Sequence, residues 1–140
     1  MLRTIIIDDE PHIRDTLSKL IMLCCPQLEI VGEASGVASG ILKIREAHPD
    51  LVFLDLNLND GSDYELLHRL QPVNFKVIFI SAFGRKTAQA FKLSNIAFLT
   101  KPFNPVELIE AVKMAEESDV SDLFFCLRAL EANIADAKTR

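Results

Sequence analysis

Residues 51–61 read LVFLDLNLNDG, and this stretch is the strongest indication of the fold class. It begins with four apolar residues that do not alternate with polar ones, which is typical of a strand covered on both faces in a parallel sheet. The run ends at Asp55, and a polar turn follows from Asn57 to Gly61. TIIIDD at 4–9 and IAFLTK at 96–101 have the same form, because charged residues follow an apolar run.

Strand and helix patterns alternate along the chain. Apolar runs predict strands at about 3–8, 28–34, 51–55, 76–81 and 96–99. Amphipathic stretches predict helices at about 11–24, from Gly36 to Pro49, after Asp60-Gly61, briefly after Gly84, and from Asn104. Five strand–helix units predict an α/β fold: a doubly wound, five-stranded parallel sheet with helices on both faces.

The last of these helices has a strong start signal. Asn104 is a preferred N-cap residue, Pro105 suits the first helical position, and Glu107 stands where a capping-box glutamate is expected. Leu108 and Val112, with Ala115, are expected to face the core.

Composition narrows the class of protein. The chain has 140 residues, about the length of one domain, and is 49% hydrophobic and 25% charged, as in globular proteins. It has neither an apolar run of about 20 residues nor a signal-peptide pattern, so we expect a cytoplasmic protein without a membrane partner. No basic cluster predicts direct nucleic-acid binding. Cys24 and Cys25 are adjacent, which argues against a disulfide framework.

Charged residues gather at the predicted strand ends. The carboxyl ends of parallel strands meet at one edge of a sheet, where open α/β sheets bind ligands. We therefore expect Asp8, Asp9 and Asp55 to converge with Lys101. Three close carboxylates repel one another unless a cation or a raised pKa compensates, and oxygen ligands suit Mg²⁺.

The same group of residues favours phosphoryl chemistry. A solvent-accessible carboxylate such as Asp55 can attack a phosphoryl group and become an aspartyl phosphate. Lys101 is expected to pair with the phosphoryl oxygens, and Ser81 can donate its hydroxyl to them. Pro102 biases Lys101 away from helical geometry and permits a cis peptide bond between the two.

Each residue also has a simpler explanation. Asp8 or Asp9 alone would be interpreted as the N-cap of the next helix, Ser81 as a polar strand end, and Phe98 as core filling. These residues follow four different predicted strands whose ends meet at one edge of the sheet, and this favours a functional site over the simpler explanations.

With these motifs the chain resembles the receiver domain of a bacterial two-component response regulator. The resemblance covers about residues 1–117 and implies the flavodoxin-like strand order 2-1-3-4-5. The matching motifs are Asp8-Asp9, Asp55 in LVFLDLNLNDG, Ser81-Ala82 and Lys101-Pro102-Phe103.

The resemblance also implies roles for single residues. Asp9, Asp55 and the backbone carbonyl of Asn57 would bind Mg²⁺, and Asp8 would assist through water. Ser81 and Phe98 would form the switch pair, with the hydroxyl moving toward the phosphate and the ring swinging inward.

Two positions differ from the family pattern. Asn59 stands four residues after Asp55, where the family commonly has proline, so this loop is expected to be looser. Phe83 stands where many relatives carry a polar residue, and a ring there is expected to slow hydrolysis of a phosphoaspartate if it lies over the site. The text NDGSDYELL at 59–67 resembles the subgroup whose output is a LytTR-type DNA-binding domain.

The segment 118–140 lies beyond the five units and is expected to be a helical linker or tail. A coiled-coil seam would have the spacing seen for Leu123, Leu127, Leu130, Ile134 and Ala137, and an amphipathic helix packed on its own domain fits this spacing nearly as well. We expect this chain to be part of a longer regulator, with a stand-alone receiver as the alternative.

Together these observations predict a signalling switch rather than an enzyme. The expected partner is a sensor histidine kinase that phosphorylates Asp55 and so controls a transcriptional output. DNA would be bound only through an output domain absent from this chain. We also expect a homodimer through the fourth helix, fifth strand and fifth helix. Two alternatives are an Mg²⁺-dependent aspartyl-phosphate phosphohydrolase, whose motif expects an acid where Asn57 stands, and a degenerate receiver that only binds partners.

Overall fold

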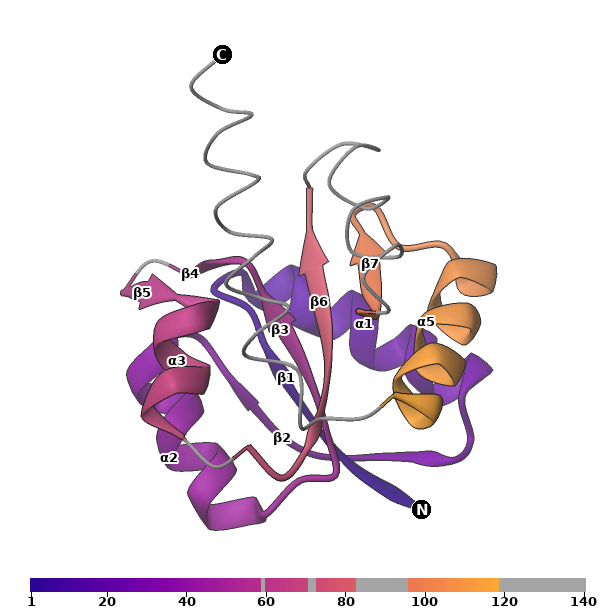
Figure 1. The fold of residues 1–140 in the computed structure, drawn as a ribbon. Coiled ribbons are helices and arrows are strands. Elements are labelled where there is room, and N and C mark those ends of the chain that lie inside the picture. The colour runs from indigo at the N-terminus through magenta and orange to yellow at the C-terminus, as the bar shows by residue number, and fades with distance from the viewer. Residues whose placement is uncertain (59, 71–72, 83–95, 119–140) are drawn as a thin grey trace.

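A five-stranded parallel sheet forms the centre of the molecule (Figure 1). The computed structural model describes residues 1–58, 60–70, 73–82 and 96–118. Neighbouring strands are parallel and run in the order β2-β1-β3-β6-β7, which is 2-1-3-4-5 for the five main strands and confirms the predicted fold. The strands are β1 (Leu2–Ile7), β2 (Leu28–Ala34), β3 (Leu51–Asp55), β6 (Lys76–Ser81) and β7 (Phe98–Thr100).

Helices cover both faces of this sheet (Figure 1). One face carries α1 (Pro11–Cys24) and α5 (Pro105–Glu117), and the other carries α2 (Val37–Ala47) and α3 (Asp63–Arg69). The predicted fourth helix and the tail after residue 118 lie outside the described residues. Among the helices that the structure describes, none is long and apolar enough to span a membrane.

The unbroken apolar runs follow from burial on both faces. In β3, Val52 and Leu54 pack toward α2 and α3, whereas Leu51 and Phe53 pack toward α1 and α5. All four are at most 1% exposed. Since side chains alternate between the two faces of a strand, a strand covered on both sides needs apolar residues at every position.

The start of α5 agrees with the predicted N-cap. Asn104 Oδ1 accepts hydrogen bonds from the backbone N–H groups of Val106 at 2.8 Å and Glu107 at 3.3 Å. The Glu107 carboxylate accepts a hydrogen bond from the Thr100 hydroxyl at 3.2 Å, so this glutamate ties α5 to the end of β7. Leu108, Val112 and Ala115 are buried, as predicted.

A short antiparallel ribbon follows β3, where the sequence predicts only a turn. It consists of β4 (Asn57–Leu58) and β5 (Gly61–Ser62), and Asn57 pairs with Ser62. Gly61 has a φ of 152°, a conformation that side-chain-bearing residues rarely adopt. The ribbon lies between the end of β3 and the start of α3.

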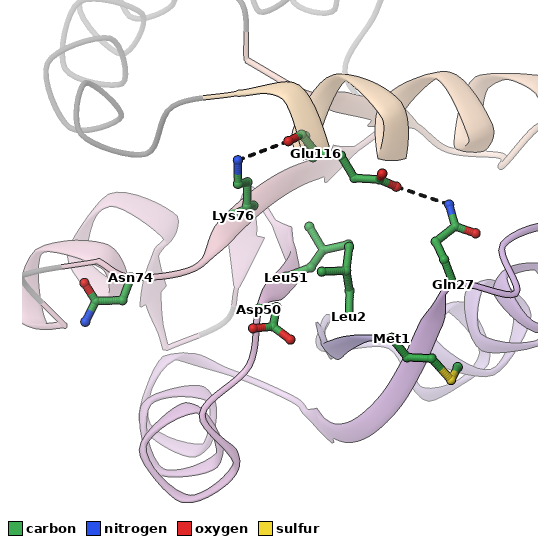
Figure 2. Close-up of a pocket in the computed structure, with 9 residues that line it drawn as sticks. Met1, Leu2, Gln27, Asp50, Leu51, Asn74, Lys76 and Glu116 are labelled. Atoms are coloured by element: carbon green, nitrogen blue, oxygen red, sulfur yellow. Dashed lines mark hydrogen bonds between the residues drawn. The ribbon is translucent and has the colours of Figure 1, made fainter.

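A pocket lies at the opposite edge of the sheet from the ends of β3 and β6 (Figure 2). Leu2, Leu51 and Lys76, from the first residues of three strands, help to line it. Lys76 Nζ donates a hydrogen bond to the carbonyl oxygen of Glu116 at 3.2 Å, which fixes the end of α5 beside this pocket. The predicted acidic site does not contribute to it.

Candidate functional site

The residues predicted for the site lie at the carboxyl ends of four neighbouring strands. Asp8 and Asp9 follow β1, Asp55 ends β3, Ser81 ends β6, and Lys101 follows β7. They are brought together because β1, β3, β6 and β7 are adjacent and parallel. Sequence positions about 90 residues apart therefore meet at one edge of the sheet.

Three carboxylates form a compact cluster at this edge. One oxygen atom from each of Asp8, Asp9 and Asp55 lies within 4.8 Å of the others. Asp8 is fully buried, Asp55 is 3% exposed, and Asp9 is half-buried. Buried anions at this separation need compensating charge, since low dielectric strengthens their repulsion and removes their hydration.

Lys101 supplies part of that charge. Its Nζ lies 2.8 Å from Asp8 Oδ2, 3.4 Å from Asp55 Oδ2 and 3.8 Å from Glu10 Oε2. Burial acts to lower the pKa of Lys101, but the carboxylates of Asp8 and Asp55 outweigh it and raise the pKa above its usual value. The peptide bond between Lys101 and Pro102 is cis, as the sequence allowed.

The donor set fits a hard divalent cation. Asp8 Oδ2 is buried and accepts no hydrogen bond within the described part of the chain, so its contact with Lys101 is an ion pair. One lysine leaves a net negative charge on three carboxylates. Carboxylate oxygens arranged in this way are the ligands that Mg²⁺ prefers in proteins.

The loop that carries Asp8 and Asp9 is held from several sides. The backbone N–H of Asp8 donates to the carbonyl of Ala34 at 3.1 Å, and Asp8 Oδ1 accepts from the backbone N–H of Glu10 at 2.9 Å. Arg14 Nη1 donates to the carbonyl oxygen of Asp8 at 2.7 Å, while Arg14 Nε lies 3.3 Å from Glu33. No sequence motif marked Arg14, because its contact with Asp8 is to a backbone carbonyl oxygen, which any residue at that position would offer.

The two predicted switch residues are both buried. Ser81 is 0% exposed, and its carbonyl oxygen accepts a hydrogen bond from the backbone N–H of Lys101 at 2.9 Å. Phe98 is 6% exposed and packs with the core between the sheet and α2 and α3. The ring of Phe98 is therefore inside the molecule in this structure.

Asn57, the predicted carbonyl ligand, is the first residue of β4 and follows Asp55 after one intervening residue. The two positions that differ from the family pattern, Asn59 and Phe83, lie outside the described residues. Asp60, which the sequence marked only as a turn residue, contacts the start of α2.

Comparison with known proteins identifies the family. The family model of the response regulator receiver domain matches residues 4–113. The chain belongs to this family. It is therefore a receiver domain of two-component signalling, a class of signalling switches that interact with histidine kinases and generally bind Mg²⁺ at an acidic site.

Curated relatives include longer regulators. An uncharacterized response regulatory protein of Vibrio parahaemolyticus is 38% identical over 114 residues, which covers 81% of this chain and 47% of that protein. A sensory transduction protein LytT of Bacillus cereus is 28% identical, covering 88% of this chain and 50% of its own length. The receiver chain thus spans about half the length of these relatives, and the LytT name agrees with the predicted subgroup.

Solved structures show the same fold. The receiver domain of the putative response regulator NarL from Mycobacterium tuberculosis has a TM-score of 0.68 at 24% identity, and covers 84% of this chain and 98% of that one. A LuxR-family response regulator from Aurantimonas has a TM-score of 0.69 at 22% identity. The match covers 100% of this chain and 99% of that one. At this identity the likeness concerns the fold alone.

Proposed function

We propose that this receiver domain is a phosphorylation-activated switch in which Asp55 accepts a phosphoryl group from a histidine kinase. The observation that carries the proposal is the convergence of buried Asp55 with Asp8, Asp9 and Lys101 at one edge of the sheet. Asp55 is positioned by β3, and its neighbours come from the ends of adjacent strands.

The transfer is a displacement at phosphorus. An oxygen of the Asp55 carboxylate attacks the phosphorus of a phosphohistidine, and the new O–P bond forms as the P–N bond breaks. The electron pair of the broken bond stays on the imidazole nitrogen, which takes up a proton from solvent. Such a transfer depends mainly on positioning and on compensation of charge on the phosphoryl oxygens.

Several groups would provide that compensation. Asp8, Asp9 and Asp55, with the backbone carbonyl of Asn57, would hold Mg²⁺, which supplies positive charge to the phosphoryl oxygens when bound. The ammonium group of Lys101 would pair with another of these oxygens, and the Ser81 hydroxyl would donate a hydrogen bond. Lys101 already lies 3.4 Å from Asp55, which supports this role.

The phosphoryl group would then change the conformation of the domain. It adds about one to two negative charges and new acceptor oxygens. Ser81 and Lys101 would satisfy these oxygens in one of two arrangements, and Phe98 would report the change, so the modification biases an existing equilibrium. We propose a transcriptional output in the cytoplasm, with DNA bound by an output domain outside this chain. Relatives of which this chain matches only about half the length include LytT and a transcriptional regulatory protein BtsR, which supports this proposal.

Intact mass after incubation with a small phosphodonor and Mg²⁺ tests the proposal. We expect one stable added phosphate on the wild type and none on Asp55→Asn, which keeps the shape of the side chain but removes the nucleophile. Asp15→Asn, at an exposed position on α1, is the matched control and should be phosphorylated normally. Phosphate on the Asp55→Asn variant at Asp8 or Asp9 would contradict the assigned roles.

The same measurement separates the alternatives. Rapid turnover of phosphodonor without a lasting adduct would indicate a phosphohydrolase. No adduct and no turnover would indicate a receiver that acts only as a binding module. The intact set of Asp8, Asp9, Asp55 and Lys101 favours the switch over the binding module.

A further inference from the structure

We propose that Asp60 is a positioning residue for phosphorylation of Asp55, because it ties the β4–β5 ribbon to the first turn of α2. The ribbon carries Asn57, whose carbonyl is the proposed Mg²⁺ ligand. This inference rests on the proposed function, and it adds a residue that lies outside the acidic cluster and that the sequence marked only as a turn residue.

Asp60 makes two hydrogen bonds to a helix that begins 23 residues earlier in the chain. Its Oδ1 accepts from the backbone N–H of Val37 at 2.7 Å, and its Oδ2 accepts from the backbone N–H of Ala38 at 3.2 Å. These donors are among the N–H groups that a helix leaves without partners in its first turn. The bonds from Val37 and then Ala38 lower the pKa of Asp60, so the acceptor is ionised at neutral pH.

Two glycines show how closely the ribbon and α2 approach each other. A Cβ atom at Gly36 would lie 2.5 Å from Asp60 Oδ1 and 2.9 Å from its Cγ, so a larger residue would push the carboxylate away. A Cβ atom at Gly61 would lie 3.0 Å from Val37 Cγ2. Gly36 has a φ of −168°, which any residue adopts, so its small size matters here rather than its backbone freedom.

A short segment of chain, residues 56–60, connects the phosphoacceptor Asp55 to the Asp60 contact. The ribbon starts two residues after Asp55, and its near end is fixed by the backbone N–H of Leu56, which donates to the carbonyl of Ile80 at 3.0 Å. Asp60 fixes the far end.

Two substitutions break the same contact from opposite sides. Asp60→Ala removes the acceptor, and Gly36→Ala places a methyl group where the Asp60 carboxylate lies. We expect each variant to bind Mg²⁺ about tenfold more weakly and to be phosphorylated about tenfold more slowly, at the lower end of effects seen for groups that support metal ligands. The double variant should be no worse than Asp60→Ala alone, because the added methyl group then has no carboxylate to displace.

Calorimetric titration with Mg²⁺ and intact mass over time provide the two readouts. Hydrogen exchange of the Val37 and Ala38 amides reports directly whether the contact is lost. Asp60→Asn keeps one carbonyl oxygen for Val37 and should recover part of the affinity, whereas Asp15→Ala, which removes an exposed carboxylate from α1, should match the wild type.

Faster amide exchange with unchanged Mg²⁺ affinity and unchanged phosphorylation rate would overturn the inference, because Asp60 would then only stabilise the fold. Additive losses in the double variant would overturn it as well. A wild type that forms no phosphate adduct would contradict the proposed function itself, so the two failures can be told apart.

Discussion

At the residue scale, the site is organised around the most deeply buried acid. Lys101 lies closer to Asp8 than to Asp55, at 2.8 Å against 3.4 Å. Asp8 is fully buried, and its desolvated charge therefore needs the lysine more than a solvated one would. The sequence predicted that these residues converge, because each follows an apolar run. It gave no information on which carboxylate the lysine approaches, since that depends on side-chain packing.

Removal of this lysine should cost stability, and Mg²⁺ should restore part of it. We expect Lys101→Met to lower the free energy of unfolding by about 2 kcal/mol without metal, because it leaves buried carboxylates uncompensated. Urea denaturation with and without Mg²⁺ measures both effects. Lys19→Met is the control: its ion pair with Asp15 is exposed, so about 0.5 kcal/mol or less is expected. Equal losses with and without Mg²⁺ would show that packing, not charge, is the cause.

The raised pKa of Lys101 also predicts how its contribution depends on pH. Its folded-state pKa lies above the ordinary value of 10.5, so the stabilisation is fully present below pH 10.5 and is lost as the pH rises through the higher folded-state value. The stability difference between wild type and Lys101→Met should therefore be constant near neutral pH and shrink in strong alkali. A difference that stays constant throughout the alkaline range would contradict this.

At the element scale, the sequence predicts features whose residues are close together in the chain, and it does not predict contacts between residues that are far apart in the chain. The start of α5 was predicted correctly because Asn104 and its two donors lie within three residues of one another. The cap that Asp60 provides for α2 joins residues 23 apart, and no local pattern marks it. The β4–β5 ribbon was missed because strands of two residues are too short for an alternating pattern.

The N-cap of α5 can be tested without touching the site. Asn104→Ala should lower the free energy of unfolding by about 1 kcal/mol, because two backbone N–H groups lose their acceptor. Asn104→Ser, which keeps an acceptor oxygen, should lose much less. Urea denaturation measures the change, and intact mass should show an unchanged phosphorylation rate. A slower rate for Asn104→Ala would mean that α5 contributes to the site beyond stability.

At the scale of the whole molecule, most large apolar side chains in the described part of the chain pack into the two core layers, but α5 leaves some exposed. Val106 is 62% exposed and Ile109 is 48% exposed. Both lie on α5, the helix that follows β7 and Lys101 in the chain. A movement of Lys101 or β7 on phosphorylation would therefore shift this surface directly. Exposed apolar residues beside a switching element favour an interface, and a symmetric regulator that reads two DNA half-sites needs a two-fold axis.

We therefore predict that the chain self-associates through the face that contains β7 and α5, more strongly when phosphorylated. Sedimentation velocity with and without a phosphate mimic measures this. Ile109→Glu should leave phosphorylation intact but weaken the dimer, because a charge would be buried at the interface. Leu42→Glu, at a 68% exposed position on α2, is the matched control and should dimerise normally.

The segment 119–140 should strengthen this association without driving it, because two heptads alone form only a marginal coiled coil in water. A chain that ends at Ser118 is therefore expected to dimerise more weakly, yet still to respond to the phosphate mimic. A monomer under every condition would rule the dimer out. A dimer that survives Ile109→Glu but disappears on truncation at Ser118 would make the tail the driver, and the α5 surface would then be available to another partner.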